Sequence, residues 1–265
     1  MRVKYYYPEQ LTRYQDVERT WSETHSDYPD GFEQFSSRPF LEQVLPGLEW
    51  KLERPRAFEL GCGTGPGACF LAERGFRVDA VDLVPAAIDV ARKIAKERKL
   101  NINYEVMDVT QIPLSGTQYD LIVDSCCLQG IVLDRDREAV FAAVRARLQP
   151  SGYYLVSNSM YSATLHNSED VIVDSTSGRT YHRYDEDCLF DPTTEVYYSP
   201  FSDANDAPED YEGSTRIAGT WYLPTRRYRT AQTLVAELER EGFEVILQTG
   251  KYGENVLCKL PPPLP

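Results

Sequence analysis

The stretch Phe58-Glu59-Leu60-Gly61-Cys62-Gly63-Thr64-Gly65 determines the fold class predicted for this chain. Its mainly apolar start predicts a short buried strand at 57–60, and three glycines at alternate positions follow directly. Glycine adopts positive φ without strain and lets the backbone approach a ligand where any Cβ would clash. Pro66 then suits the first turn of a helix. The stretch therefore predicts a strand, a tight ligand-binding turn and a helix.

The segment from 56 to 157 alternates short apolar strands with longer helical stretches, which is typical of βαβ units and a parallel sheet. We predict strands at 57–60, 78–81, 103–106, 119–124 and 153–157, and helices at 68–74, 85–98 and 135–148. A helix at 230–241 and a hairpin over 242–260 are expected to complete the sheet. The predicted fold class is α/β: a Rossmann-like, doubly wound, mostly parallel seven-stranded sheet with a C-terminal antiparallel hairpin.

Two segments lie outside this alternation. About seventy residues after 157 are rich in Tyr, Thr, Ser and Asp, and β-prone pieces at 171–174, 178–184, 195–198 and 216–222 predict a small antiparallel sheet. The N-terminal segment carries predicted helices at 9–21 and 38–44. The expected units are an N-terminal helical cap (1–55), a Rossmann-like core (56–159), a β-rich insertion (160–229) and a terminal helix and hairpin that complete the core (230–265).

Composition restricts the partners. With 28 basic and 41 acidic residues, the net charge of −13 repels a phosphate backbone, so no nucleic-acid partner is expected. No stretch approaches the roughly 18 apolar residues of a membrane span, and the start lacks the apolar stretch of a signal peptide; a cytoplasmic location without a membrane partner is expected. The six cysteines form no Cys-x-x-Cys pair and the three histidines are not near paired cysteines, so no metal is expected.

Two classes of cofactor could use the glycine turn. Gly63-x-Gly65-x-x-Ala68 can be matched to a dinucleotide fingerprint, with Asp82 at a suitable distance to bind a ribose. Glu59 distinguishes the two classes, because a dinucleotide would place its pyrophosphate at the turn, where this carboxylate would repel it. S-adenosylmethionine (SAM) has no phosphate but carries a cationic amino group and a sulfonium. Glu59 therefore favours SAM.

Four segments in order resemble the motifs of the class I SAM-dependent methyltransferases: the glycine turn, 78–83, 104–109 and 119–127. The resemblance implies that Glu59 meets the methionine end of SAM, directly or through water, and that the turn packs on the nucleoside. It also implies that Asp82 accepts hydrogen bonds from both ribose hydroxyls and that Asp108 binds the adenine amine, although a turn cap is the competing interpretation of Asp108. The implied cofactor-binding residues are Glu59, Gly61, Cys62, Gly63, Thr64, Gly65, Asp82, Leu83, Asp108, Val109, Asp124 and Ser125.

Methyl transfer is an in-line displacement at a sulfonium carbon, so the protein mainly aligns the acceptor and excludes water. A base is needed only if the acceptor must lose a proton, and His166 is the predicted base, followed by His182 and His25. The resemblance also places Cys126 and Cys127 near the acceptor, although buried, inert thiols are the competing interpretation.

The sequence thus predicts SAM-dependent methyl transfer to a small-molecule acceptor, bound between the insertion and the N-terminal segment. A homodimer is possible. Two alternatives stay open: a nucleotide-linked oxidoreductase, and a SAM-binding sensor without catalysis. The first would bind NAD, whereas the second would bind SAM and transfer no methyl group.

Overall fold

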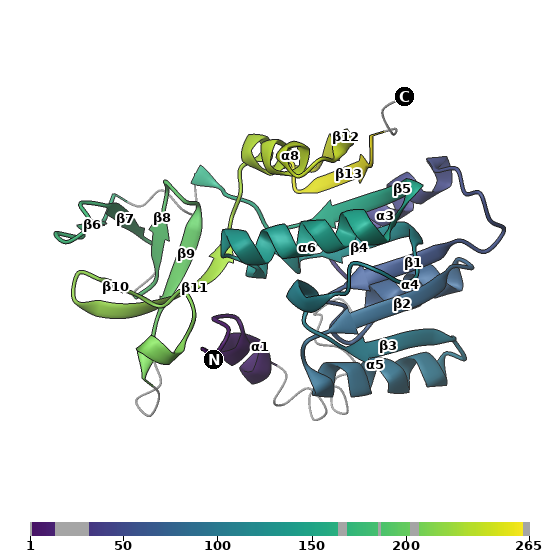
Figure 1. Ribbon diagram of the computed structural model, residues 1–265, viewed down its shortest axis with the longest axis horizontal. Helices are drawn as coiled ribbons and strands as arrows, with labels where there is room; N and C mark the ends of the chain where they lie inside the picture. Colours follow the sequence, from purple (N-terminus) through teal and green to yellow (C-terminus); the bar gives the residue numbers. More distant parts are fainter. Residues whose placement is uncertain (1, 14–31, 164–168, 185–186, 202–206, 262–265) are drawn as a thin grey trace.

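The computed structural model describes residues 2–13, 32–163, 169–184, 187–201 and 207–261 of the chain. Its main sheet has seven strands in the order β12-β13-β5-β4-β1-β2-β3 (Figure 1). The strands are β1 (Arg56–Leu60), β2 (Arg77–Asp82), β3 (Ile102–Val106), β4 (Tyr119–Ser125), β5 (Leu148–Ser157), β12 (Glu244–Thr249) and β13 (Asn255–Lys259). The first five pair in parallel, while β13 runs antiparallel to β5 and β12 to β13. The predicted fold class is confirmed.

Helices cover both faces of this sheet because alternate strand residues point to opposite sides. Phe58 and Leu60 join one buried cluster with residues of α6 and α8, whereas Ala57 joins a second cluster with residues of α3, α4 and α5. These helices are α3 (Arg38–Val44), α4 (Pro66–Glu73), α5 (Pro85–Glu97), α6 (Asp134–Arg147) and α8 (Ala231–Arg240). Coverage on both faces explains why β4 is almost continuously buried. Within the described residues, no helix has the length and apolarity needed to cross a bilayer.

A second sheet, antiparallel and six-stranded, lies beside the first in the order β10-β11-β9-β8-β7-β6 (Figure 1). Its strands are β6 (Val171–Val173), β7 (Thr180–Arg183), β8 (Leu189–Asp191), β9 (Val196–Pro200), β10 (Thr215–Ile217) and β11 (Thr220–Arg227). The antiparallel sheet was predicted, but two details differ. The expected strand at 216–222 is a hairpin that turns at Ala218 and Gly219, both at positive φ. Strand β8 was not among the predicted pieces.

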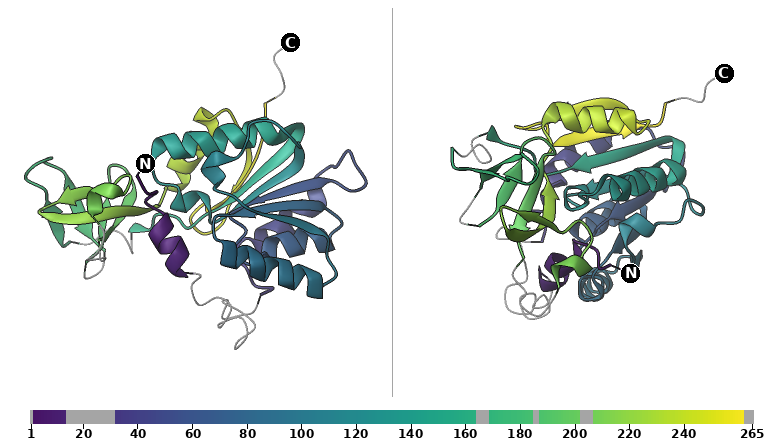
Figure 2. Two further views of the ribbon diagram at one scale, coloured as in Figure 1. Left: turned by 60° about the horizontal axis from the view of Figure 1, so that its bottom comes forward. Right: turned by 60° about the vertical axis from the view of Figure 1, so that its left-hand side comes forward.

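The N-terminal residues connect the two sheets. Helix α1 (Tyr7–Arg13) lies between the main sheet and the second sheet in both views of Figure 2. It starts two residues before the helix predicted at 9–21, and the remainder of that prediction lies outside the described residues. The predicted helix at 38–44 matches α3.

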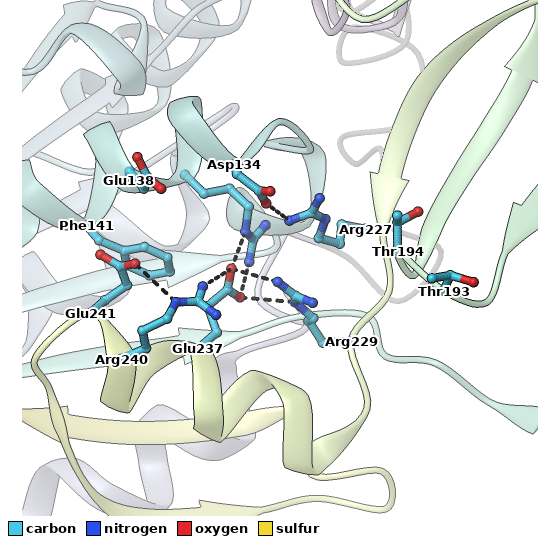
Figure 3. A pocket seen from close by; sticks show the side chains of 11 residues that line it. Asp134, Glu138, Phe141, Thr193, Thr194, Arg227, Arg229, Glu237, Arg240 and Glu241 are labelled. Carbon is cyan, nitrogen blue, oxygen red and sulfur yellow. Dashed lines mark hydrogen bonds and ion pairs between the residues drawn. The ribbon is translucent and has the colours of Figure 1, made fainter. Parts of the chain in front are cut away.

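The sheets also meet at a cavity of about 330 Å³ lined by paired charges from α6, α8 and β11 (Figure 3). Arg137 and Glu237 form a bidentate pair at 2.7 and 2.6 Å, and each side chain is only 2% exposed. Arg229 donates two further hydrogen bonds to Glu237, at 3.0 and 3.2 Å, and one to Glu195 at 2.8 Å. These ion pairs are called the ionic joint here. They connect α6 and α8, which cover the main sheet, to Arg229, which follows β11 of the second sheet.

Candidate functional site

A different cavity, of about 340 Å³, opens at the carboxyl ends of β1 to β4. Strand β1 lies between β4 and β2, so the chain crosses over in opposite directions on its two sides, and ligands of open α/β sheets bind at such a switch point. The cavity is lined by most of the expected cofactor residues, namely Glu59, Gly61, Cys62, Gly63, Asp82, Leu83, Asp108, Val109 and Ser125. Thr64, Gly65 and Asp124 are outside this lining.

The glycine turn brings the backbone to the cavity wall. Gly61, Gly63 and Gly65 have φ of 61°, 54° and 86°, in the left-handed region that side chains strain. A Cβ on Gly61 would come within 2.7 Å of the Cys127 sulfur. Gly67, which the sequence motif did not single out, lines the cavity and leaves no room for a Cβ beside the Glu59 carboxyl. Positions 61 and 67 are therefore restricted to glycine by close approach.

Glu59 is the buried carboxyl on the cavity wall. Its side chain comes from β1, it is 3% exposed, and its Oε2 has no hydrogen-bond partner among the described residues. Burial, together with the charges of Asp82 and Asp124, raises the pKa of Glu59 to about 8, although the Ala68 amide opposes the shift. A buried carboxyl with an open acceptor site suits a cationic donor. These properties fit the amino group of SAM.

Asp82 and Asp108 line the cavity beyond the turn. The Asp82 carboxylate accepts the amides of Gly63 at 2.8 Å and Val84 at 2.9 Å, which fix it at the end of β2. Asp108 caps the short helix η2 (Val109–Gln111) by accepting the Thr110 amide at 2.9 Å. Asp108 is thus the turn cap that was the competing interpretation of its sequence, and its carboxylate also lines the cavity. Asp79, which falls within β2, instead accepts a hydrogen bond from Tyr119 at 2.8 Å.

Asp124 is fully buried at the end of β4. Its Oδ1 accepts the amides of Cys127 and Leu128, each at 3.0 Å, and its Oδ2 has no partner among the residues that the structure describes. Burial raises the pKa of Asp124 to about 7, against the opposing effect of the two amides and Arg137. The carboxyl therefore shapes the turn that carries Ser125, Cys126 and Cys127 to the cavity.

Part of the cavity lining is polar and is called the polar wall here. It includes Ser36, Cys126, Gln129, Ser159 and Arg226. Cys126 has a φ of 64°, a strained value for a residue with a side chain. The expected placement of Cys126 and Cys127 at the cavity agrees with this lining, and burial raises the pKa of the Cys127 thiol, which keeps it protonated.

Arg226 reaches this wall from β11 of the second sheet. It donates to the Glu9 carboxylate of α1, with one hydrogen bond at 2.6 Å. Sequence reasoning missed this pair, because the partners are 217 residues apart and neither belongs to a motif.

The predicted base is not among the described residues: His166 and His25 both lie outside them. His182 is on β7 of the second sheet and does not line the cavity. The described part of the chain contains no cluster of three or more His, Cys, Asp or Glu side chains arranged to hold a metal.

Comparison with known proteins defines the class. Residues 57–152 match the model of a methyltransferase domain. The structure is similar to that of the PH0226 protein from Pyrococcus horikoshii OT3 (TM-score 0.62, 19% identity, covering 94% of this chain and 99% of that one). It is also similar to a SAM-dependent methyltransferase from Clostridium acetobutylicum ATCC 824 (TM-score 0.56, 17% identity, 96% and 98% covered). Residues 57–152 therefore match a methyltransferase domain, and the fold is the one that SAM-dependent methyltransferases share.

Among curated proteins, the chain is similar to a ubiquinone biosynthesis O-methyltransferase from Histophilus somni (strain 2336), with 26% identity over 57% of this chain and 63% of the relative. The chain spans about half to two thirds of the length of the first curated relatives that it matches. The domain match and the fold both count against the nucleotide-linked oxidoreductase.

Proposed function

We propose that this protein transfers a methyl group from SAM to a small-molecule acceptor. The observation that carries the proposal is Glu59, a buried carboxyl on the wall of the switch-point cavity, one oxygen of which has no partner among the described residues. A cationic amino group would donate to that oxygen, whereas a dinucleotide pyrophosphate has no donor to offer it. The methyltransferase domain match over 57–152 supports the same cofactor.

Each wall of the cavity has a separate role in this proposal. Glu59 receives the methionine amino group, the backbone of 61–65 packs on the nucleoside, Asp82 accepts the ribose hydroxyls and Asp108 the adenine amine. When bound, SAM supplies a methyl group on a positively charged sulfur. Asp124 does not line the cavity. Its carboxyl accepts the amides of Cys127 and Leu128 and so positions the turn that does.

The acceptor would bind at the polar wall formed by Ser36, Cys126, Gln129, Ser159 and Arg226. Hydroxyl, amide and guanidinium groups suit a small polar molecule better than an apolar one. The names of similar proteins also indicate small acceptors, including 2-heptyl-1-hydroxyquinolin-4(1H)-one. Neither nucleic acid nor a membrane is proposed as a partner, and cytoplasmic location and a homodimer stay predictions. His166 stays the predicted base for an acceptor that must lose a proton.

Titration calorimetry with SAM and with NAD tests the cofactor. We expect SAM to bind and NAD not to bind; NAD binding without SAM binding would contradict the proposal. Incubation with radiolabelled SAM and fractionated metabolite extracts then tests the transfer. Label in a small-molecule fraction is expected, whereas SAM binding with no transfer across the fractions would identify a sensor.

A further inference from the structure

The N-terminal residues up to the end of α1 form a strap, defined here as residues 2–13, which contacts both sheets. Val3 exchanges backbone hydrogen bonds of 2.8 Å with Asp210 and Glu212 of the second sheet's connecting loop. On the other side, the Tyr5 hydroxyl accepts the Val132 amide at 2.6 Å. These anchors fix the chain immediately before Tyr6, whose side chain lines the cavity.

Tyr6 donates its hydroxyl hydrogen bond to Asp108, the acid proposed to meet adenine. The Tyr6 oxygen is 2.8 Å from Asp108 Oδ2 and 3.0 Å from Oδ1, and the side chain is 5% exposed. Burial raises the pKa of the Tyr6 hydroxyl, so that it remains a neutral donor. Its ring is held edge-on to Tyr5 with centroids 4.8 Å apart. A buried, oriented donor therefore faces the carboxylate.

The hydrogen bonds of Asp108 are unequally shared between its two oxygens. Oδ1 accepts the amide of Thr110 at 2.9 Å and its hydroxyl at 2.8 Å. Oδ2 accepts Tyr6 at 2.8 Å, and the next donor, the Tyr7 hydroxyl, is 3.5 Å away. A carboxylate oxygen accepts about two hydrogen bonds, and Tyr7 supplies the second one at Oδ2 only at 3.5 Å, so a closer donor can take that position. The closer donors, Tyr6 and Thr110, orient the carboxylate.

We propose that Tyr6 is a positioning residue, whose hydroxyl orients Asp108 so that Oδ2 receives the exocyclic amine of adenine. This inference rests on the proposed function, because it requires the adenine of SAM to lie beside Asp108. The N-terminal strap thereby becomes part of cofactor recognition, although it lies outside the domain match at 57–152. If the Tyr6 hydroxyl instead occupied the position of the adenine amine, it would compete with adenine for Asp108 and weaken cofactor binding.

The test compares two ligands that differ at the adenine amine. S-adenosylhomocysteine carries the amine, whereas S-inosylhomocysteine carries a carbonyl oxygen there. Dissociation constants of both ligands are measured by titration calorimetry for the wild-type protein and for Tyr6→Phe, which keeps the ring and removes the hydroxyl. We expect Tyr6→Phe to reduce the preference for S-adenosylhomocysteine roughly 3- to 10-fold, the effect of one hydrogen bond.

The matched control is Tyr119→Phe. Tyr119 also donates to a carboxylate at 2.8 Å, that of Asp79, but neither residue lines the cavity. This control should leave the preference unchanged. An equal loss of affinity for both ligands in Tyr6→Phe, or tighter binding of S-adenosylhomocysteine, would overturn the inference. If the wild-type protein does not bind S-adenosylhomocysteine, both the proposed function and the inference are overturned. The wild-type titration alone separates this outcome from failure of the inference on Tyr6.

Discussion

At the scale of single residues, Glu59 combines a stability cost with a binding function. Its pKa of about 8 means that the carboxyl is mostly protonated at neutral pH in the protein without ligand. A cationic ligand beside it would favour the ionised form, since opposite charge lowers a carboxyl pKa. Binding and proton loss at this residue are therefore linked.

We expect binding of S-adenosylhomocysteine at pH 7 to release about one proton from Glu59. Calorimetry in buffers of different ionisation enthalpy measures the number. Glu59→Gln should abolish the release and weaken binding roughly 10- to 100-fold, because a charge-assisted hydrogen bond is lost. Equal proton release by wild-type and variant proteins would contradict the role of Glu59.

The same shift predicts the pH dependence of stability. The pKa of Glu59 rises from 4.5 to about 8 on folding, so the folded state binds more protons between these values. The free energy of unfolding should therefore fall as pH rises from about 4.5 to 8. Urea unfolding of the ligand-free protein measures this, and Glu59→Gln should show a smaller decrease. A variant with an unchanged decrease would assign the effect to other groups.

At the scale of elements, the periodic segments were predictable. Strands β1 to β5 and helices α4 to α6 agree with the expected ranges to within a few residues, apart from the longer start of β5. Each of these elements repeats a pattern over several residues, so local sequence is sufficient. The ionic joint between α6 and α8 was not predictable, because Arg137 and Glu237 are 100 residues apart.

Loss of that joint should be costly. Burial opposes the charge of Glu237, but Arg137 and Arg229 outweigh it and lower its pKa to about 2. Replacing Glu237 with Gln leaves the buried Arg137 guanidinium without a carboxylate, while Arg229 keeps Glu195, so we expect the free energy of unfolding to fall by about 3–5 kcal/mol. Urea denaturation at pH 7 measures the loss. Asp89→Asn, which removes an exposed pair with Arg92, is the control and should change it by less than about 0.5 kcal/mol.

The ionic joint also makes the free energy of unfolding depend on pH in the acidic range. The contribution of Glu237 is complete above its ordinary pKa of 4.5 and is lost as pH falls toward about 2. The difference in unfolding free energy between wild type and Glu237→Gln should therefore shrink over this window. A difference that stays constant from pH 5 to pH 2 would show that Glu237 is not ionised by its arginines.

At the scale of the whole molecule, the strap joins the two sheets across the cavity. Tyr5 is 1% exposed, and its hydroxyl accepts the amides of both Val132 and Leu133. Tyr6 contacts Asp108 and Glu9 contacts Arg226, so one short segment touches the cofactor wall and the acceptor wall. The cavity is therefore assembled from parts of the chain more than 200 residues apart.

Removal of the Tyr5 hydroxyl should loosen this connection. Tyr5→Phe leaves two buried amides without an acceptor, which should lower the free energy of unfolding by about 1–3 kcal/mol. Tyr7→Phe is the control, because the Tyr7 hydroxyl is 3.5 Å from its nearest acceptor on Asp108. Urea denaturation of both variants measures the difference. Equal stability of the two variants would show that the strap is not anchored through Tyr5.

The sequence by itself determined the α/β class, the glycine turn and the identity of the acids around it. These features depend on residues close together in the chain, where hydrophobic period and the positive φ of glycine act locally. Only the tertiary structure brought Tyr6 to Asp108 and Glu9 to Arg226, and only it buried Asp124. Both pairs join distant segments, and the burial that gives Glu59 and Asp124 their raised pKa values exists only after the sheet and its covering helices have packed.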